Sequence, residues 1–408
     1  MKILFLVQIF ETPNDNGSDR MFFFAKNLVK KGHIVRVITG NVDYKNAVPR
    51  FNTRKSVHKN YEGVEVVYTP VFTNFRGSFF KRFIFYVSYI FSSFWELLKS
   101  SKNTDLIYGV STPLTVPFIS AIISKFRGVP FIFEVTDVWP DAAIHSGVIN
   151  NKFIIFCTKK IENFCYRNAN EIICLTEGIA QNIKDKGVNT NKIKLITNGV
   201  DFDLFNEVDQ KKINEQKKSL NIEGKFIGMY LGAHGKYNSL DTILNAAVYL
   251  KNCDNFIFIF VGEGDEKASL VKIVKDNNLN NVLFYPSIKR NKASEMLAIA
   301  DYFLLPNLKG SFFEGNLPNK LFDFLASKRP IIVSGKVESG RLVKKINAGV
   351  VIDAEEPFQL AESIKSLYKL NPEQRAKMGS NGREYVKNNY NRLTHVKDLE
   401  HIIDNLIN

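Results

Sequence analysis

Residues 312–335 read FFEGNLPNKLFDFLASKRPIIVSG, and this stretch decides the fold of the chain. Two apolar runs of strand length flank its centre, at residues 302–306 and 331–333. Between them apolar side chains recur at the spacing of one helix face, and Pro318 lies near the helix start, where a missing N–H costs nothing. These side chains are Leu317, Leu321, Phe324 and Leu325. A strand, a loop, a helix and a second strand predict a βαβ unit of a parallel sheet.

The same helix carries a narrow polar stripe, formed by Asn316, Lys320 and Asp323 at positions i, i+4 and i+7. The loop delivers the helix N-terminus, with its free N–H groups and positive dipole end, to the carboxyl edge of the sheet. A diphosphate is stabilised at such a place. Lys320 adds positive charge there, and Asp323 can accept hydrogen bonds from sugar hydroxyls. The alternative is an ordinary amphipathic helix with a solvated polar face.

This segment resembles the nucleotide-sugar-binding element of family 4 retaining glycosyltransferases, where a loop rich in Gly, Pro and Ser precedes K-x-x-E-[YF]-x-A-x-x-x-P. Here the motif reads Lys320-Leu-Phe-Asp323-Phe-Leu-Ala326, and Pro330 follows. In that family the acidic residue binds the ribose of the nucleotide. The resemblance therefore implies that Asp323 has this role.

The chain departs from the family motif at two positions. Asp323 stands where the family has Glu, and Gly315 stands eight residues earlier, where another Glu of the family contacts the donor sugar. Glu314 is the nearest carboxylate. Glu314 and Gly315 are therefore both candidates for the donor-sugar contact.

Length and composition narrow the class of protein. The chain has 408 residues, enough for two or three domains, and its 45% hydrophobic content is ample for large cores. A net charge of +14 favours anionic partners, namely nucleic acid, acidic lipids or phosphorylated substrates, although scattered lysines also serve solubility. The chain has no recognisable nucleic-acid module, so we expect no nucleic acid partner.

The cysteines and the first residues indicate the compartment. The four cysteines lie in apolar settings without a Cys-x-x-Cys pair, as expected for buried thiols of a reducing compartment and not for disulfides or a zinc site. Residues 1–10 are apolar, but charge returns at Glu11 without a cleavage site of small residues. We therefore interpret residues 2–10 as a first strand and expect a cytoplasmic protein.

The N-terminal region continues as a loop over 11–18, a helix over 19–31 and a strand over 33–39. This order is the opening of a Rossmann-like domain. A loop with one glycine is weak evidence for NAD. In the resembled family this loop lies near the donor phosphates, which implies that Gly17 and Ser18 lie near these phosphates here. Arg20 is expected to contact the acceptor.

A second polar cluster, Thr136-Asp137-Val138-Trp139-Pro140-Asp141, follows an apolar strand at 130–135. The carboxyl end of a parallel strand is where α/β folds place their chemistry. The cluster resembles a D-x-W-P-[ED] element of a bacterial polysaccharide branch of family 4, which makes Asp137 the leading candidate for the catalytic carboxylate. Asp141 and His145 are the second choices for this role. The alternative for Asp141 is to cap a helix, and the alternative for His145 is to be an ordinary surface imidazole.

Residues 78–96 are dense in aromatic side chains. The 13 uncharged residues from 83 to 95 are too few for a bilayer, which needs about 20. One interpretation is a buried helix. The other is a helix in the membrane interface, in which residues 79–98 contact the inner face of the cytoplasmic membrane and present a lipid-linked acceptor. Candidates for exposure are Phe79, Phe80, Tyr86 and Trp95.

The C-terminal half begins with a second strand, glycine loop and helix. The strand covers 226–231, and the loop 232–239 contains His234, Gly235 and Lys236. The resembled family places a cation of this loop on the donor diphosphate, which implies this role for Lys236. His234 can hydrogen-bond a phosphate, although a lone histidine in a loop is more often simply exposed.

Two further segments match the family in the right order. Residues 198–205, NGVDFDLF, match the crossing between its two lobes. Val261-Gly-Glu-Gly matches its V-G-x-G loop, whose backbone closes round the nucleotide, so Gly262 and Glu263 are substrate-binding candidates. A tight strand-to-helix turn is the alternative.

The resemblance covers nearly the whole chain and implies an α/β protein of the GT-B architecture, with two Rossmann-like domains facing across a cleft. We assign residues 1–200 to the acceptor domain, 201–385 to the nucleotide-sugar domain and 386–408 to a helix that crosses back.

The implied activity is retaining transfer of a sugar, expected to be an N-acetylated amino sugar, from a UDP-sugar to a lipid-linked or saccharide acceptor in O-antigen or capsule synthesis. No metal cofactor is expected, because cations and helix N–H groups neutralise the leaving diphosphate. The groups assigned to this task are Lys236, Lys320 and the N–H groups of Asn316, Leu317 and Asn319. The rival functions are a GT-B sugar-nucleotide epimerase and a non-catalytic nucleotide-sugar- or lipid-binding protein.

Overall fold

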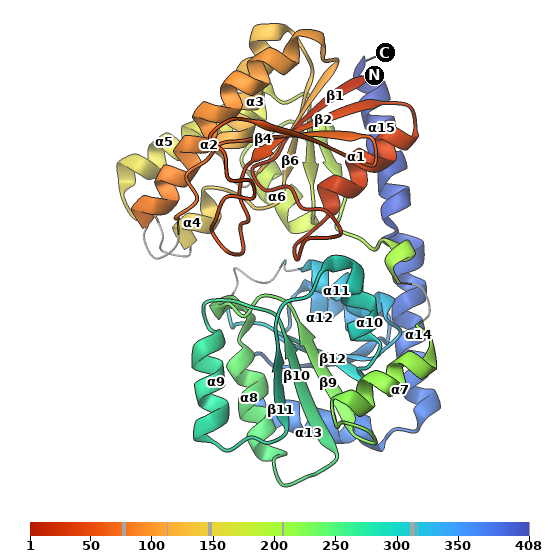
Figure 1. Cartoon of the computed structure of the whole chain (residues 1–408). Helices are drawn as coiled ribbons and strands as arrows, with labels where there is room; N and C mark the ends of the chain where they lie inside the picture. Colours follow the sequence, from red (N-terminus) through yellow and green to blue (C-terminus); the bar gives the residue numbers. More distant parts are fainter. Residues whose placement is uncertain are drawn as a thin grey trace. The chain divides into compact units, whose positions relative to one another are not determined.

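The computed structural model describes residues 1–75, 79–111, 113–145, 149–205, 208–310, 315 and 317–407. Contacts divide the chain into two compact units. Unit 1 comprises Met1–Thr12, Asp19–Thr197 and Thr394–Asn408, and unit 2 comprises Pro13–Ser18 and Asn198–Leu393. Each unit has its own sheet with helices packed on both faces (Figure 1), as expected for two Rossmann-like domains.

The sheet of unit 1 has the strand order β3-β4-β2-β1-β5-β6-β7-β8. Its described pairs are parallel, except that β3 and β4 form an antiparallel hairpin at one edge. Central strands such as β5 are buried along their whole length, because helices cover both faces. The bounds are β1 (Lys2–Leu6), β2 (Ile34–Gly40), β3 (Val57–Tyr61), β4 (Val64–Thr69), β5 (Leu106–Val110), β6 (Phe131–Val135), β7 (Glu171–Cys174) and β8 (Ile193–Leu195).

Two groups of helices enclose this sheet. One face packs against α1 (Arg20–Lys30) and α15 (Arg392–Ile407). The other face packs against α2 (Phe79–Ser100), α3 (Thr115–Arg127), α5 (Lys152–Asn168) and α6 (Glu177–Asp185). The short α4 (Asp141–His145) follows β6. No helix of the described residues is long and apolar enough to cross a bilayer.

The sheet of unit 2 is parallel throughout its described pairs, in the order β11-β10-β9-β12-β13-β14. The bounds are β9 (Phe226–Leu231), β10 (Phe256–Val261), β11 (Val282–Tyr285), β12 (Tyr302–Pro306), β13 (Ile331–Ser334) and β14 (Gly349–Ile352). The sequence order reverses between β9 and β12. In open α/β sheets this switch point is where ligands bind, outside the carboxyl ends of the strands.

The helices of unit 2 also form two groups. The helices α8 (Leu240–Tyr249), α9 (Lys267–Asp276) and α13 (Pro357–Lys369) pack on one face. On the other face lie α7 (Gln210–Ser219), α10 (Ala293–Leu297), α11 (Asn319–Ala326), α12 (Glu338–Lys345) and α14 (Pro372–Asn389).

The βαβ unit expected from residues 302–335 is confirmed. The strands β12 and β13 pair in parallel, with Phe303 opposite Ile331, and α11 connects them. The apolar stripe is buried as predicted, in the core cluster that also contains β12. Pro318 is the N-cap residue of α11, one position before the first helical turn.

Two helices of the C-terminal half depend on their caps. Gln210–Ser219 is the helix α7, which is capped by the Asp209 side chain and anchored by buried Ile213. The helix α14 begins at Pro372 because Asn371 and Gln374 form a reciprocal capping box.

Candidate functional site

Lys320 lies at the switch point of unit 2, in the first turn of α11. Its Nζ donates to Tyr230 Oη at 2.6 Å and to Asn238 Oδ1 at 2.7 Å, and it lies 4.5 Å from the centroid of the Tyr230 ring. No carboxylate among the described side chains pairs with it. Burial lowers its pKa to about 7, because desolvation disfavours the ammonium form. An anion bound here would therefore pair with the Lys320 ammonium, whose hydrogen-bond partners in the described structure are neutral groups.

Two glycine-containing loops adjoin Lys320. The loop after β9 and the loop after β10 are tied by hydrogen bonds from Gly232 N to Val261 O at 3.0 Å and from His234 N to Glu263 O at 2.9 Å. At Gly262, with φ of 152°, an added Cβ would lie 1.9 Å from the Gly232 carbonyl oxygen. Only glycine allows this approach. The V-G-x-G match therefore marks a position where two loops touch.

His234 is fully buried, which excludes the alternative of a simply exposed loop histidine. Its ring packs against Tyr230, Phe260 and Phe284, with centroids 5.9–6.3 Å away. Burial, with Lys267 contributing, lowers its pKa to about 4, so the imidazole is neutral at physiological pH. Neither ring nitrogen has a hydrogen-bond partner within the described part of the chain. His234 thus packs beneath the loops, and its hydrogen bond to a donor phosphate stays a prediction.

The other described residues assigned to the donor lie in the loops after β9 and β10 and at or just before the start of α11. Lys236 is exposed in a short 3-10 helix, and Asn319 is the exposed first residue of α11. Gly235 and Gly315 are half-buried, and Leu317 is buried. The Glu263 carboxylate accepts from Lys267 Nζ at 2.9 Å. Glu314 and Asn316 lie outside the described residues.

Asp323 forms a buried pair that sequence reasoning missed. Its two carboxylate oxygens accept from both terminal nitrogens of Arg290, at 2.5 and 2.7 Å. The side chains are 8% and 10% exposed. A bidentate pair fixes the orientation of the carboxylate as well as its charge. Asp323 is thus held in one orientation by Arg290, which joins the candidate site.

The turn that carries Arg290 also holds the first loop of the chain. Arg290 N donates to Asp15 O at 2.9 Å, and Asn291 N donates to Pro13 O at 3.1 Å. Asn291 Nδ2 also donates to Asn14 Oδ1 at 3.2 Å. These contacts group the loop with Gly17 and Ser18 with unit 2.

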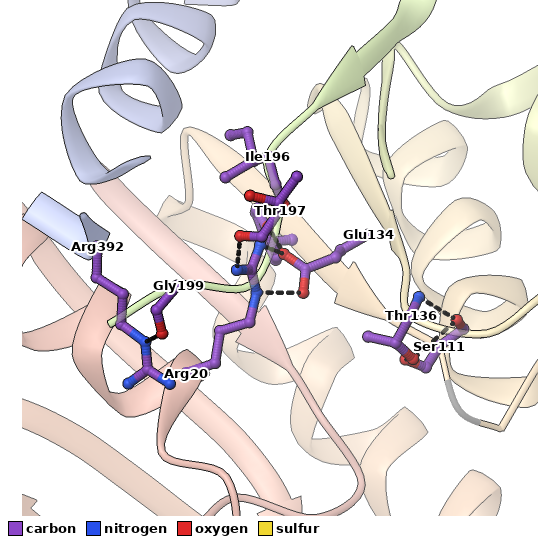
Figure 2. Close-up of polar contacts among 9 residues, drawn as sticks. Arg20, Ser111, Glu134, Thr136, Ile196, Thr197, Gly199 and Arg392 are labelled. Atoms are coloured by element: carbon purple, nitrogen blue, oxygen red, sulfur yellow. Dashed lines mark hydrogen bonds and ion pairs between the residues drawn. The ribbon is translucent and has the colours of Figure 1, made fainter. Parts of the chain in front are cut away.

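Arg20 is not placed to meet an acceptor, contrary to expectation (Figure 2). It is 4% exposed, and its Nε lies 3.1 Å from Glu134 Oε1. Its terminal nitrogens donate to the carbonyl oxygens of Thr197 and Ile196, at 2.6 and 2.8 Å. Glu134 also accepts from the buried Tyr108 hydroxyl. Arg20 therefore fixes the end of β8 to the centre of the sheet.

In unit 1 the structure places Asp137 and Asp141 beyond the carboxyl end of β6. Asp137 is exposed, and the preceding Thr136 is fixed by a hydrogen bond from its N to Ser111 Oγ at 3.1 Å (Figure 2). Asp141 begins α4 and pairs with Lys186 at 2.8 Å, so it has a structural partner. His145 ends α4, and its side chain lies outside the described residues. Asp137 is thus an exposed carboxylate at this edge, and its catalytic role stays a prediction.

Nothing among the described side chains gathers three potential metal ligands in one place. The polar groups that the structure does gather are Lys320 with Tyr230 and Asn238, the backbone of two loops, and Asp323 with Arg290. A cation and helix N–H groups suit a diphosphate, and a carboxylate suits vicinal hydroxyls.

Comparison with protein families gives two matches. Residues 20–204 match the model described as Glycosyltransferase Family 4, and residues 211–385 match the model described as Glycosyl transferases group 1. The first match covers most of unit 1 and ends at residue 204, shortly after unit 2 begins at Asn198, and the second match lies within unit 2.

Individual relatives agree with these models. The chain is 24% identical over 349 residues to WcaI of Escherichia coli (strain K12), named as a colanic acid biosynthesis glycosyl transferase, covering 83% of this chain and 84% of WcaI. It resembles the crystal structure of Anabaena HepE in complex with UDP and glucose, with a TM-score of 0.74, 15% identity and coverage of 99% and 100%. It also resembles WaaG, a glycosyltransferase of lipopolysaccharide biosynthesis, with a TM-score of 0.71, 15% identity and coverage of 98% and 99%. These likenesses identify the GT-B fold.

Proposed function

The chain belongs to the GT-B glycosyltransferases that join a family 4 domain to a group 1 domain, and on this premise we propose that it transfers a sugar from a UDP-sugar to a lipid-linked or saccharide acceptor. We propose retention of the anomeric configuration, an N-acetylated amino sugar as the donor sugar, and a role in surface polysaccharide synthesis such as O-antigen or capsule. The names of WcaI and WaaG support that role, and the UDP complex of HepE supports the nucleotide.

The observation that carries this proposal is the arrangement around Lys320. Its ammonium is held by Tyr230 and Asn238 beside the start of α11, at the switch point of a parallel sheet. A diphosphate there gains the charge of Lys320 and the free N–H groups of the first helical turn. Asp323, one turn further along α11, then accepts from the ribose hydroxyls.

In the proposed reaction the bond between the anomeric carbon and the diphosphate oxygen breaks, and its electron pair stays on that oxygen. Lys320 and Lys236 stabilise the negative charge that develops there. The acceptor oxygen forms the new bond on the same face of the sugar, and its proton passes to the departing phosphate oxygen. Asp137 orients the acceptor hydroxyl. In this scheme Lys320 and Lys236 neutralise the leaving diphosphate, a task for which other transferases use a metal ion.

We further propose a lipid-linked acceptor and a position at the inner face of the cytoplasmic membrane, through residues 79–98. Phe80 and Trp95, two of the four aromatic residues expected to be exposed, are 66% and 60% exposed on α2. Tyr86 is half-buried against Phe85, and the Phe79 side chain lies outside the described residues. These exposures support the membrane interpretation over a fully buried helix.

The test is a transfer assay with a panel of UDP-sugars and lipid-linked saccharides in the presence of EDTA, with the new linkage read by NMR. We expect UDP release that depends on the acceptor, a retained anomeric configuration and full activity in EDTA. An inverted product or a strict need for Mg²⁺ would contradict the scheme. Conversion of the UDP-sugar without an acceptor would favour the epimerase.

A further inference from the structure

Unit 1 contains a cavity of about 420 Å³ at the carboxyl edge of its sheet. Asn41, which follows β2, and Pro70, which follows β4, both line this cavity, and the two strands are parallel neighbours. Its other walls come from the loop between β2 and β3 and from the segment after β4, and include Asn52, Arg54 and Thr73. The volume falls within the roughly 300–1,000 Å³ of small-molecule sites, and the carboxyl edge is where α/β folds bind their ligands. None of the described residues that line the cavity was assigned to the candidate site.

One wall of this cavity is built around the buried side chain of Asn41. Asn41 Nδ2 donates to Phe51 O at 2.7 Å, and Phe51 N donates to Asn41 Oδ1 at 2.8 Å. Asn41 is 2% exposed, so these bonds are shielded from water. Asp43 N also donates to Val48 O at 2.8 Å and closes the first part of the same loop. The loop that lines the cavity is therefore held in a fixed shape by hydrogen bonds to its backbone.

The chemistry of the lining favours an anionic sugar. Arg54 supplies a guanidinium, which binds a carboxylate or a phosphate through two parallel hydrogen bonds. Asn52 and Thr73 supply an amide and a hydroxyl, which suit the hydroxyl groups of a sugar. None of the described lining residues is acidic, and the loop from residue 41 to residue 56 carries four bases against one carboxylate. The cavity therefore combines positive charge with groups that bind hydroxyls.

Polar residues continue along this edge from the cavity toward Asp137. Between β2 and β6 the sheet contains β1 and β5, and Gln8 lies just beyond the end of β1. Gln8 O accepts from Gly40 N at 3.1 Å, so Gln8 lies beside the strand that leads to the cavity. Gln8 is 1% exposed, and within the described part of the chain neither its Oε1 nor its Nε2 has a hydrogen-bond partner. Because buried amides are almost always paired, and a sugar hydroxyl both donates and accepts, a bound saccharide would satisfy this side chain.

The spacing of the strands gives the distance between the cavity and Asp137. The strands β2 and β6 are three spacings apart in the sheet, which is about 14 Å at roughly 4.8 Å per spacing. A single sugar cannot span this distance, whereas a chain of several sugars can. We propose that the cavity binds an acidic sugar of an elongated acceptor, through its carboxylate or phosphate, while a sugar several units away receives the transfer at Asp137. This inference rests on the proposed function, and it adds a charge and a minimum length to the acceptor.

Binding of small sugars to the whole chain tests the cavity directly. The probes are methyl glucuronide, glucose 6-phosphate and the neutral methyl glucoside, titrated by ligand-observed NMR with saturating UDP to occupy the donor site. At least one of the two anionic sugars should bind about tenfold more tightly than methyl glucoside. Arg54→Gln should remove this difference, because it removes the charged guanidinium. The matched control is Lys55→Gln, since Lys55 is an exposed base of the same loop that does not line the cavity, and this variant should bind like wild type.

The pattern of affinities decides the proposal. Preference for the glucuronide identifies a uronic acid as the bound sugar, and preference for the phosphate identifies a phosphorylated sugar. Equal affinity for all three probes would overturn the proposal. Equal losses in Arg54→Gln and Lys55→Gln would also overturn it, because they would show a general attraction by the basic loop. Arg54 and Lys55 are both exposed, so neither substitution disturbs the core.

Transfer to lipid-linked saccharides tests the length of the acceptor. Wild type should prefer an acceptor with an acidic sugar several units from the receiving sugar over its neutral counterpart, and Arg54→Gln should raise the KM for that acceptor roughly tenfold. Gln8→Met removes the unpaired buried amide at similar side-chain size, so it should raise the KM for long acceptors without lowering the melting temperature. Preference for a single-sugar acceptor, or an unchanged acceptor KM in both variants, would contradict the placement of the acceptor along this edge.

The melting temperature with UDP separates this inference from the proposed function. A rise with UDP but no binding of the anionic sugars would reject only the cavity as part of the acceptor site. Binding of the anionic sugars without any response to UDP would reject the proposed function and leave a saccharide-binding protein.

Discussion

At the residue scale, Asp323→Ala tests the proposed ribose contact, because its effect on donor binding can be measured separately from its effect on stability. In Asp323→Ala the buried Arg290 guanidinium loses its bidentate partner, which costs about 3–5 kcal/mol of unfolding free energy. Loss of a ribose hydrogen bond to a charged group should also raise the donor KM by roughly ten- to a hundredfold. Urea unfolding and initial-rate kinetics measure the two effects.

A double variant provides the control for Asp323→Ala. Arg290→Met/Asp323→Leu replaces the buried pair by apolar groups and should recover most of the stability. Its donor KM should remain high, because the ribose acceptor is still absent. An unchanged KM in either variant would contradict the assignment of the ribose to Asp323.

Lys320 predicts a pH dependence of donor binding. Its pKa of about 7 in the free protein means that the ammonium dominates below pH 7 and the neutral amine above it. A bound diphosphate favours the ammonium, so above pH 7 binding must take up a proton. The Kd for UDP should therefore rise between about pH 7 and 9, by up to about tenfold per unit. Calorimetry in buffers of different ionisation enthalpy measures both the Kd and the proton uptake.

The control for this titration is Lys320→Met. It should bind UDP weakly at every pH and show no proton uptake above pH 7. A wild-type Kd that stays constant over this range would mean that Lys320 does not face the phosphates.

At this scale the sequence made Lys320 and Asp323 candidates because both belong to a motif with fixed spacing. It missed Arg290, whose neighbours Lys289 and Lys292 make it look like one of many surface bases. Only the fold brings it to Asp323. The burial of His234 could not be predicted for a similar reason, because it depends on two loops that meet from different strands.

At the element scale, the contact between the loops after β9 and β10 predicts the effect of Gly262→Ala. The added Cβ would lie 1.9 Å from the Gly232 carbonyl oxygen, so one loop must move. We expect a loss of about 1–3 kcal/mol in stability and weaker UDP binding, measured by urea unfolding and calorimetry.

Gly187→Ala is the matched control for the loop variant. Gly187 also has a positive φ, of 78°, but an added Cβ there meets no atom within 4 Å. It should cost some stability through backbone strain and leave UDP binding unchanged. Equal UDP affinity in the two variants would show that the loop contact is not part of the site.

The elements themselves were largely predictable, because buried parallel strands are near-continuous apolar runs. The expected strand at 226–231 coincides with β9, and the expected helix at 19–31 contains α1. The helix α7 was missed because it buries only Ile213, so its sequence lacks an apolar stripe.

At the scale of the whole molecule, the grouping of distant segments was the least predictable feature. Pro13–Ser18 groups with unit 2 through backbone hydrogen bonds to residues 290 and 291, and backbone groups carry no sequence signal. Thr394–Asn408 groups with unit 1 because Val396, Leu399 and Ile403 complete one core of its sheet. The family 4 and group 1 matches agree with two domains of this kind.

The central claim is that unit 2 binds a nucleotide-sugar donor through Lys320, and thermal unfolding tests it most directly. Melting temperatures of the whole chain would be measured with UDP, GDP and CMP without metal, in wild type, Lys320→Met and Lys336→Met. Lys336 is an exposed surface cation, so its variant should respond like wild type. Removal of a buried cation should leave Lys320→Met at least as stable as wild type.

We predict that UDP raises the melting temperature of wild type and Lys336→Met, because a ligand that binds only the folded state stabilises it, and that Lys320→Met shows little response. No response of wild type to any of the three nucleotides, or an undiminished response in Lys320→Met, would contradict the claim.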